Sequence, residues 1–451
     1  MSEFTLTQKQ KQILEDLNNK HYRHICLYGG GRSGKTTFLT FILFMRALKV
    51  PNSFHVIIRD THTSMKSSIF EQTITKLLSF DNFKTLKKHP NLKRNKQDLT
   101  ITFPNGSIIY CYGLNTENAV ERILGNEYST IYYNECSNLD YARITPLRSR
   151  LAQKTSLNNK FFYDFNPPLK THWTYKYFIE QKDPIMNHEL QNKNEFYITK
   201  VNPIDNLTNI DDSYLIEQKY AGEEHYRRFV EGDFQDEIKG ALFSIEMIQS
   251  ANDCNLNNKT TEEIRNILSQ IVIGIDPAVT STVNSDKTGI IVCGTNGDDF
   301  FVLEDRTGFH TPLEWARIIY ELHDKWQANA VVVETNQGGD LLEENIKSFG
   351  QRYQNNRYLN IQQVRAVFGK RIRAEPIATL YARNKVKHIQ NYHNDIEQKG
   401  LIDLENEMLS FTGNKNQQSP DRLDALVHAL QYLTPKTGEI DKTAFFQDIF
   451  V

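Results

Sequence analysis

The sequence is organised around Tyr28-Gly29-Gly30-Gly31-Arg32-Ser33-Gly34-Lys35-Thr36-Thr37, which fits the pattern G-x-x-x-x-G-K-[ST]. Such a loop needs glycine because its backbone passes close to phosphate oxygens and points several N–H groups at them. We expect Lys35 to meet the β- and γ-phosphates of a nucleotide and the Thr36 hydroxyl to hold Mg²⁺. The loop therefore predicts a nucleoside triphosphate site, assigned to Gly29, Arg32, Ser33, Gly34, Lys35, Thr36 and Thr37.

The segments on both sides of this loop have the order that phosphate binding requires. Residues 24–28 (HICLY) predict a buried strand, and residues 37–43 (TFLTFIL) open an apolar helix whose positive N-terminal end faces the phosphates. Further strands are predicted at 54–59, 130–133 and 160–165, and a hairpin is predicted between 99–103 and 107–112 around Pro104-Asn105-Gly106. Together these elements predict an α/β domain with a mostly parallel sheet and flanking helices.

A polar pair, Asn134-Glu135, follows the strand at 130–133. A P-loop ATPase keeps its second motif at the end of such a strand, where one carboxylate supports Mg²⁺ and the next activates the attacking water. Glu135 suits the role of the base. Asn134 offers a neutral amide oxygen in place of the metal-side carboxylate.

Four other residues can complete this site, and each has an ordinary alternative. Asn166 follows the strand at 160–165 and can sense γ-phosphate hydrolysis, although Asn-Pro-Pro also makes a plain turn. Gln10, on a short helix predicted over 6–17, can read an adenine edge, or it is a solvated glutamine. Arg32 can supply positive charge in cis and Arg122 can reach a neighbouring subunit, or both are surface arginines.

Composition sets the outer limits of the interpretation. A length of 451 residues favours two domains over one. The formal net charge is −2, so binding of nucleic acid requires local basic patches. The five cysteines are scattered without a C-x-x-C pair, which favours buried thiols over disulfides or a zinc site. We find no signal peptide and no apolar run long enough to span a bilayer, and we expect no membrane association.

A second domain is predicted from residue 270 onward. Strands are predicted at 271–277, 289–293, 300–304 and 330–334, and a helix is predicted at 311–326. An antiparallel meander, a helix and a further strand follow one another in the RNase H-like order, which predicts a mixed sheet with flanking helices. The first and last of these strands end in Asp276 and Glu334, which this order brings to adjacent strand ends.

The last predicted helix adds further acidic groups. Asp421 and Asp424 fall on one face of it, with His428 one turn further along. Together with Asp276 and Glu334, these carboxylates form the hard oxygen ligand set of a two-metal phosphodiesterase that uses Mg²⁺ or Mn²⁺. Taken singly, Asp276 is also an ordinary strand-end turn residue, and Asp421 and Asp424 are ordinary helix N-terminal charges.

These patterns divide the sequence into a P-loop ATPase core at 1–201, a linker or lid subdomain at 202–269, and an RNase H-like nuclease domain at 270–451. Within the middle part, residues 214–229 predict one amphipathic helix. The last part contains a basic cluster at Lys370, Arg371, Arg373, Arg383, Lys385 and Lys387. Such a cluster suits a phosphate backbone, and a solvated helix face explains it nearly as well.

Over nearly its full length the sequence resembles the large terminase subunits of tailed bacteriophages. The resemblance rests on residues 29–36, Asn134-Glu135, 165–168 (FNPP), 274–277 (GIDP), 333–339 (VETNQGG) and 421–425 (DRLDA). That family joins an N-terminal packaging ATPase to a C-terminal RNase H-like nuclease and pumps double-stranded DNA into procapsids. The sequence departs from it at Asn134, where the family pattern usually has Asp.

The resemblance implies a role for each motif and a set of partners. It implies that Lys35 and Thr36 bind ATP with Mg²⁺, that Glu135 is the ATPase base, that Asn166 lies in a coupling motif and that Gln10 reads adenine. It also implies that Asp276, Glu334 and Asp421 hold two Mg²⁺ or Mn²⁺ ions for endonuclease cutting, with Asp424 as an accessory. The implied partners are a portal protein, a small terminase subunit and further copies of the chain in a ring, in the host cell cytoplasm and transiently on the procapsid.

Two other functions are compatible with the same motifs. A repair or recombination ATPase-nuclease would translocate or unwind DNA without a portal, although we find no helicase motifs in the sequence. An ATP-gated DNA-binding assembly platform with a weak motor would be separated from a packaging enzyme by ATPase assays with and without DNA.

Overall fold

The computed structural model describes residues 3–115, 117–211, 213–220, 222–277, 287–334, 339–364, 368–390, 401–414 and 419–434. The chain divides into two compact units, of which the first is formed by Met1–Lys239 and the second begins at Gly240. This division falls inside the segment 202–269, and the three-part division of the sequence stays a prediction.

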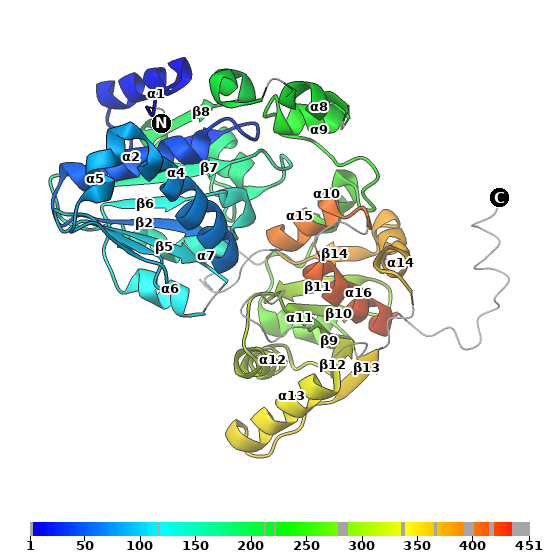
Figure 1. The fold of residues 1–451 in the computed structure, drawn as a ribbon. Helices are drawn as coiled ribbons and strands as arrows, with labels where there is room; N and C mark the ends of the chain where they lie inside the picture. The colour runs from blue at the N-terminus through cyan, green and yellow to red at the C-terminus, as the bar shows by residue number, and fades with distance from the viewer. Residues whose placement is uncertain are drawn as a thin grey trace. The chain divides into compact units, whose positions relative to one another are not determined.

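The N-terminal unit is built on one large sheet, which is visible in Figure 1. Among the described residues it has eight strands in the order β3-β4-β5-β2-β6-β7-β1-β8. These strands are β1 His24–Tyr28, β2 Phe54–Arg59, β3 Lys93–Asn95, β4 Thr100–Thr102, β5 Ile108–Gly113, β6 Thr130–Tyr133, β7 Lys160–Phe165 and β8 Phe196–Lys200. The run from β5 to β8 in this order pairs in parallel, whereas β3 and β4 form an antiparallel edge. The mostly parallel sheet and the β4–β5 hairpin are therefore confirmed.

Both faces of the central strands of this sheet are buried, which explains why β1, β2, β6 and β7 are mostly apolar. Side chains alternate along a strand, so that Ile25 and Leu27 of β1 join the core on the side of α2. Cys26, between them, joins the core on the other side, which contains Tyr163 and Trp173. All five cysteines of the chain are buried free thiols.

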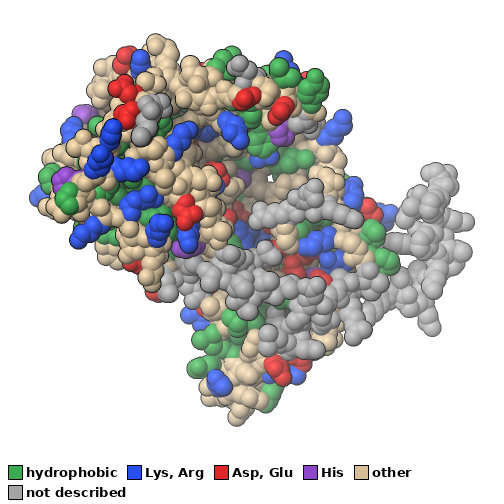
Figure 2. Space-filling model, in the orientation of Figure 1, with side chains coloured by type: hydrophobic (Ala, Val, Ile, Leu, Met, Phe, Trp, Pro, Cys, Tyr) green, Lys and Arg blue, Asp and Glu red, His purple; other side chains and the backbone are tan. Residues whose placement is uncertain are grey.

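Short helices connect the strands of this unit. They are α1 Gln8–Asn19, α2 Lys35–Lys49, α3 His62–Ser64, η1 Met65–Thr73, α4 Ile74–Ser79, η2 Asp81–Phe83, α5 Lys84–Lys88, α6 Glu117–Leu124, η3 Cys136–Asn138, α7 Tyr141–Ile144, η4 Pro146–Arg150, η5 Tyr175–Glu180, η6 Lys193–Glu195, η7 Pro203–Asn209, α8 Tyr214–Tyr220 and α9 Glu223–Phe229. The single helix predicted over 214–229 is wrong, because Gly222 adopts a φ of 106° between α8 and α9. Figure 2 shows lysine and arginine side chains gathered over the region of α4 and α5.

The C-terminal unit is built on a mixed sheet. Its described strands follow the order β13-β12-β9-β10-β11-β14. They are β9 Gln270–Asp276, β10 Gly289–Thr295, β11 Phe300–Asp305, β12 Ala330–Glu334, β13 Ile361–Val364 and β14 Val386–His388. The first three form an antiparallel meander, and β12 pairs in parallel with β9, so the RNase H-like order is confirmed. The helices are α10 Ile245–Asn252, α11 Thr261–Ile267, α12 Pro312–Trp326, α13 Gly339–Tyr353, α14 Lys370–Ala382, α15 Ile402–Ser410 and α16 Asp421–Leu433.

Two glycines bring α16 unusually close to this sheet. A Cβ atom on Gly274 of β9 would lie 2.3 Å from the carbonyl oxygen of Ala425, and one on Gly289 of β10 would lie 2.0 Å from the carbonyl oxygen of Asp421. Real Cβ atoms do not approach backbone oxygens so closely, so both positions require glycine. The first turns of α16 are thereby fixed beside the end of β9.

No helix in the part of the chain that the structure describes is long and apolar enough to cross a membrane.

Candidate active sites

The phosphate-binding loop between β1 and α2 depends on glycine for its conformation and for its packing. Gly29 has a φ of 138° and Gly34 a φ of 81°, which side-chain-bearing residues rarely adopt. The N–H group of Gly30 donates to Oδ1 of Asn202 at 2.9 Å, and a Cβ on Gly30 would lie 2.5 Å from the carbonyl oxygen of Phe229. Residues after β8 therefore form the outer support of the loop, a role that sequence analysis missed because they lie more than 170 positions away.

A cavity of about 280 Å³ adjoins this loop. It is lined by Gly31, Arg32, Ser33, Gly34, Lys35, Thr36, Thr37, Lys76, Glu135, Asp164, Phe165, Asn166, Asn206 and Asn209. Backbone N–H groups at the start of α2 and the Lys35 ammonium give the cavity positive potential, which fits the phosphates of a nucleotide. The structure thus brings most residues of the predicted nucleotide site together around one cavity.

Lys35 is fixed by the loop itself. Its Nζ donates to the carbonyl oxygens of Gly29 at 3.1 Å and Gly30 at 2.6 Å, and to the Ser33 hydroxyl at 2.9 Å. It also donates to Oδ1 of Asn166 at 3.2 Å, which places Asn166 beside the predicted position of the γ-phosphate. Burial lowers the pKa of Lys35 to about 8, and the nearby carboxylate of Asp164 opposes this shift.

A buried carboxylate that sequence analysis did not assign lies next to Thr36. Asp164, in β7, is 1% exposed, and its Oδ2 accepts the Thr36 hydroxyl proton at 2.6 Å. Its Oδ1 accepts from Nδ2 of Asn134 at 2.9 Å and from the backbone N–H of Glu135 at 2.8 Å. The sequence signal that could have identified it is an aspartate within an otherwise apolar strand, directly before Phe165-Asn166.

Glu135 leaves the end of β6 in a left-handed conformation, with a φ of 48°. This conformation is uncommon for a residue other than glycine, and it turns the side chain out of the sheet. Nη2 of Arg59, at the end of β2, lies 2.6 Å from Oε2 of Glu135. Arg59 also donates to Oδ1 of Asn134. One arginine therefore positions both residues of the predicted second motif.

The other three residues that were predicted to complete the nucleotide site are Gln10, Arg32 and Arg122. Gln10 is buried, its Oε1 accepts the N–H of Thr7 at 3.0 Å, and its Nε2 lies 3.3 Å from an ideal Cβ built on Gly34. Arg32 lies over the ring of Tyr214, at 5.6 Å from the ring centroid. Arg122 is exposed in the last turn of α6, and its role towards a neighbouring subunit stays a prediction.

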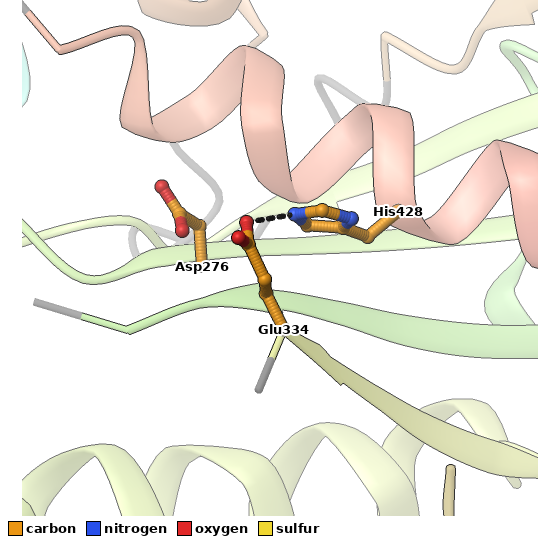
Figure 3. A group of neighbouring side chains, drawn as sticks. All are labelled: Asp276, Glu334 and His428. Carbon is orange, nitrogen blue, oxygen red and sulfur yellow. Dashed lines mark hydrogen bonds and ion pairs between the residues drawn. The ribbon is translucent and has the colours of Figure 1, made fainter. Parts of the chain in front are cut away.

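The second site lies at strand ends of the C-terminal unit. Val333 pairs with Ile275, so that Glu334 and Asp276 end neighbouring parallel strands. His428 of α16 faces both, and the possible ligand atoms of the three side chains all lie within 4.8 Å of one another (Figure 3). Nε2 of His428 lies 2.9 Å from Oε2 of Glu334, and this hydrogen bond lowers the pKa of Glu334. His428 is thus a site residue that the sequence signalled only by its one-turn spacing from Asp424.

Asp421 and Asp424 act on this site through their charges. They are 8% and 3% exposed, and with burial they raise the pKa of Asp276 to about 8. Burial makes the largest contribution, followed by Asp424 and then Asp421. Of the described residues, the set of mutually close ligand atoms contains Asp276, Glu334 and His428, and the ligand roles of Asp421 and Asp424 stay predictions.

Two basic residues of α14 reach the same acids. Nζ of Lys370 lies 2.5 Å from Oδ2 of Asp424, and Arg373 lies 3.2 Å from Glu334 and 3.4 Å from Asp424. These two members of the predicted basic cluster therefore balance part of the acidic charge. Elsewhere in the cluster, Lys385 pairs with Asp299 at 3.0 Å.

The acidic site fits a divalent cation. Asp276 resists ionisation because it is partly buried among other carboxylates, and a bound cation would relieve that repulsion. Carboxylate oxygens suit Mg²⁺, and the imidazole of His428 makes the donor set suitable for Mn²⁺ as well.

Each of the two units matches the model of a known protein family. Residues 21–233 match the family model described as the phage terminase large subunit, and residues 273–433 match the model described as the terminase RNaseH-like domain. No curated protein matches the chain.

Several solved structures are similar to this chain at low sequence identity. The large terminase from a thermophilic bacteriophage has 14% identity and a TM-score of 0.44, over 95% of this chain and 98% of that chain. The HK97 bacteriophage large terminase has 11% identity and a TM-score of 0.43, over 95% of each chain. The human cytomegalovirus terminase nuclease domain has 14% identity and a TM-score of 0.32, over 43% of this chain and 96% of that chain.

Each family match contains one of the two candidate sites. The first match contains the loop at Lys35 and the pair Asn134-Glu135, and the second contains Asp276, Glu334 and His428. The chain therefore belongs to the large terminase subunits of phages, with the ATPase domain in its N-terminal unit and the RNase H-like nuclease domain in its C-terminal unit.

Proposed function

We propose that this chain is a DNA-packaging motor subunit that hydrolyses ATP to translocate double-stranded DNA into procapsids and cuts concatemeric DNA. The main support is that one chain combines a phosphate-binding cavity around Lys35 and Thr36 with a partly buried acidic site around Asp276 and Glu334. Packaging requires both activities, because DNA must be moved into the procapsid and then released from the concatemer by cutting.

In the ATPase site, each residue takes one role. Lys35 and the first N–H groups of α2 bind the phosphates, and Thr36 holds Mg²⁺, which neutralises phosphate charge when ATP is bound. Glu135 accepts a proton from the attacking water, and Arg59 positions its carboxylate. Gln10 reads the adenine edge and Asn166 connects the γ-phosphate position to the rest of β7.

In the nuclease site, Asp276 and Glu334 would hold two Mg²⁺ or Mn²⁺ ions, with Asp421, Asp424 and His428 completing the donor set. Such ions stabilise the attacking and leaving oxygens of a phosphodiester when bound. The four carboxylates can bind cations only when ionised, so the raised pKa of Asp276 makes metal loading dependent on pH.

The partners of the proposed motor are double-stranded DNA, a portal protein, a small terminase subunit and further copies of the chain in a ring. Exposed lysines on α4 and α5, among them Lys76, Lys84, Lys87 and Lys88, offer a surface for DNA phosphates (Figure 2). Such a motor works in the host cell cytoplasm and transiently on the procapsid.

The test is a DNase-protection assay with portal-bearing procapsids, linear double-stranded DNA and ATP. We expect wild-type protein to protect the DNA, Lys35→Ala to protect none, and Asp276→Asn to protect linear DNA normally because that substrate needs no cut. Protection by wild-type protein that does not depend on ATP would contradict the motor function. A chain that turns over ATP and moves along DNA without a portal would instead be a repair or recombination enzyme.

A further inference from the structure

We propose that Asp164, in β7, supplies the metal-side carboxylate that Asn134 lacks in the ATPase site. The proposal rests on the ATPase function proposed above and adds a positioning residue for its Mg²⁺·ATP. In effect, the carboxylate lies on the neighbouring strand β7 and not at the end of β6.

The contacts of Asp164 place its carboxylate at the predicted metal ligand. Thr36 is the residue of the loop that is expected to hold Mg²⁺, and its hydroxyl lies 2.6 Å from Oδ2 of Asp164. Asn134 also reaches this hydroxyl, with its Nδ2 at 3.3 Å. Both residues are therefore at the correct place to act on a Thr36-bound cation, but Asp164 alone of this pair has a negative charge to offer.

Register explains why the two positions are equivalent. β6 and β7 pair in parallel with Tyr133 opposite Tyr163, so that Asn134 and Asp164 follow as neighbours at the same edge of the sheet. Their side chains are joined by a hydrogen bond of 2.9 Å from Nδ2 of Asn134 to Oδ1 of Asp164. An exchange of the two residue types would preserve this hydrogen bond with its direction reversed.

The charge of Asp164 is also available, whereas Arg59 would neutralise part of the charge of a carboxylate at position 134. Arg59 donates to Oδ1 of Asn134, and an aspartate there would form a buried ion pair with it. Within the described residues, no ion pair within 4.0 Å includes the Asp164 carboxylate, although the Lys35 ammonium lies near enough for the two charges to interact. Its contacts come from neutral donors, namely the Thr36 hydroxyl, the Asn134 amide and the Glu135 N–H group.

A purely structural role for Asp164 is the competing explanation, since it also accepts the N–H group of Glu135. The two explanations differ in what Asp164→Asn should do. Asparagine keeps the shape and can keep both hydrogen bonds to Oδ1, so the fold and metal-free nucleotide binding should persist. The loss of charge should remove the metal-dependent part of the affinity, by roughly 10–100-fold for a residue that supports a metal ligand.

The experiment is a calorimetric titration of the full-length protein with ATPγS in Mg²⁺ and in EDTA, together with the melting temperature. The variants are Asp164→Asn, the exchange Asn134→Asp/Asp164→Asn, and the control Asp183→Asn. Asp183 is matched because it accepts the N–H groups of Ile185 and Met186 and the Tyr141 hydroxyl, outside the cavity.

We expect Asp164→Asn to bind ATPγS in EDTA within about twofold of wild type and to lose most of the gain from Mg²⁺. The exchange variant should recover a measurable part of that gain, and the control should keep all of it. A wild-type Mg²⁺ gain in Asp164→Asn would overturn the proposal, as would an equal loss with and without Mg²⁺ or an exchange variant that folds but recovers nothing. A wild-type protein that does not bind ATPγS at all would overturn the ATPase function and this proposal with it.

Discussion

Replacing Asp276 by asparagine should stabilise the metal-free C-terminal unit while it abolishes DNA cutting. Asp276 is a candidate metal ligand at the end of β9, and its surroundings oppose its ionisation. Functional sites commonly sacrifice stability in this way, so a gain in stability that accompanies a loss of activity would identify Asp276 as a functional residue.

The size and sign of the effect follow from the pKa of this carboxyl group. Burial and the charges of Asp424 and Asp421 raise the pKa of Asp276 from 3.8 to about 8. Between these pH values the folded protein retains a proton that the unfolded chain has lost, so stability falls as pH rises, by at most about 1.4 kcal/mol per pH unit. The upper bound at pH 7 is roughly 4 kcal/mol, and we expect a gain of roughly 1–3 kcal/mol because Asp276 is only partly buried and water screens the neighbouring charges. Asparagine does not ionise, so this pH dependence should disappear.

The assay is urea unfolding of the full-length protein in EDTA at pH 5, 7 and 8, followed by hydrogen-exchange mass spectrometry of peptides from β9, β12 and α16. This readout reports on the C-terminal unit separately from the ATPase domain. Asp305→Asn is the matched control, because Asp305 is 4% exposed and its Oδ2 lies 2.7 Å from Nε of Arg422. Removing that partner should destabilise the unit.

The reasoning is refuted if Asp276→Asn lowers the stability of the C-terminal unit at pH 7, or if the variant retains the wild-type dependence of stability on pH. Addition of Mn²⁺ should raise the stability of the wild-type unit but not that of the variant, because the variant has lost a charged ligand.

Four further substitutions follow from the same structure, and one of them tests a pH effect. Lys35→Ala should abolish ATP hydrolysis, because the γ-phosphate loses its positive partner, and DNA-stimulated turnover in that variant would contradict the loop assignment. Glu135→Gln should still bind ATPγS while turnover falls by roughly 10²–10⁴-fold, and normal turnover would place the base elsewhere. Gly274→Ala should impair plasmid nicking and lower the free energy of unfolding by about 1–3 kcal/mol, because the new Cβ would lie 2.3 Å from the carbonyl oxygen of Ala425. Unchanged nicking would show that α16 can move without loss of activity. Burial lowers the pKa of His55 from 6.5 to about 3, so the contribution of His55 to the stability of the N-terminal unit should be fully present above pH 6.5 and fall towards pH 3 by up to about 1.4 kcal/mol per pH unit. Urea unfolding at pH 5 and 7 measures this slope, which His55→Gln should reduce.

Local sequence patterns were sufficient to predict most of the fold. The phosphate-binding loop between β1 and α2 combines fixed residue types with a strand and a helix on either side, so its prediction depends on adjacent residues alone. The same holds for the start of α12, where Thr311 is the cap and Pro312 the first helical residue, as predicted. Strand-end carboxylates Asp276 and Glu334 could be paired because the RNase H-like order specifies which strands are neighbours.

Contacts that depend on strand order or on distant segments could not be predicted in this way. Asp164 supports the ATPase site because β7 pairs with β6, which no local pattern reveals. Asn202 and Phe229 support the phosphate-binding loop from the segment that composition marked only as a linker or lid. His428 reaches Glu334 because glycines in β9 and β10 let α16 approach the sheet, and the resulting helix position is a property of packing.

The central claim is that one chain contains two separable active sites, and a paired measurement of ATP turnover and plasmid nicking tests it most directly. The proteins are the wild type, Lys35→Ala and Asp276→Asn. Both activities are measured on one preparation of each protein, with Mn²⁺ present. We predict that Lys35→Ala loses ATP turnover and keeps nicking, and that Asp276→Asn loses nicking and keeps ATP turnover. Loss of both activities in either variant, at a wild-type melting temperature, would contradict the claim.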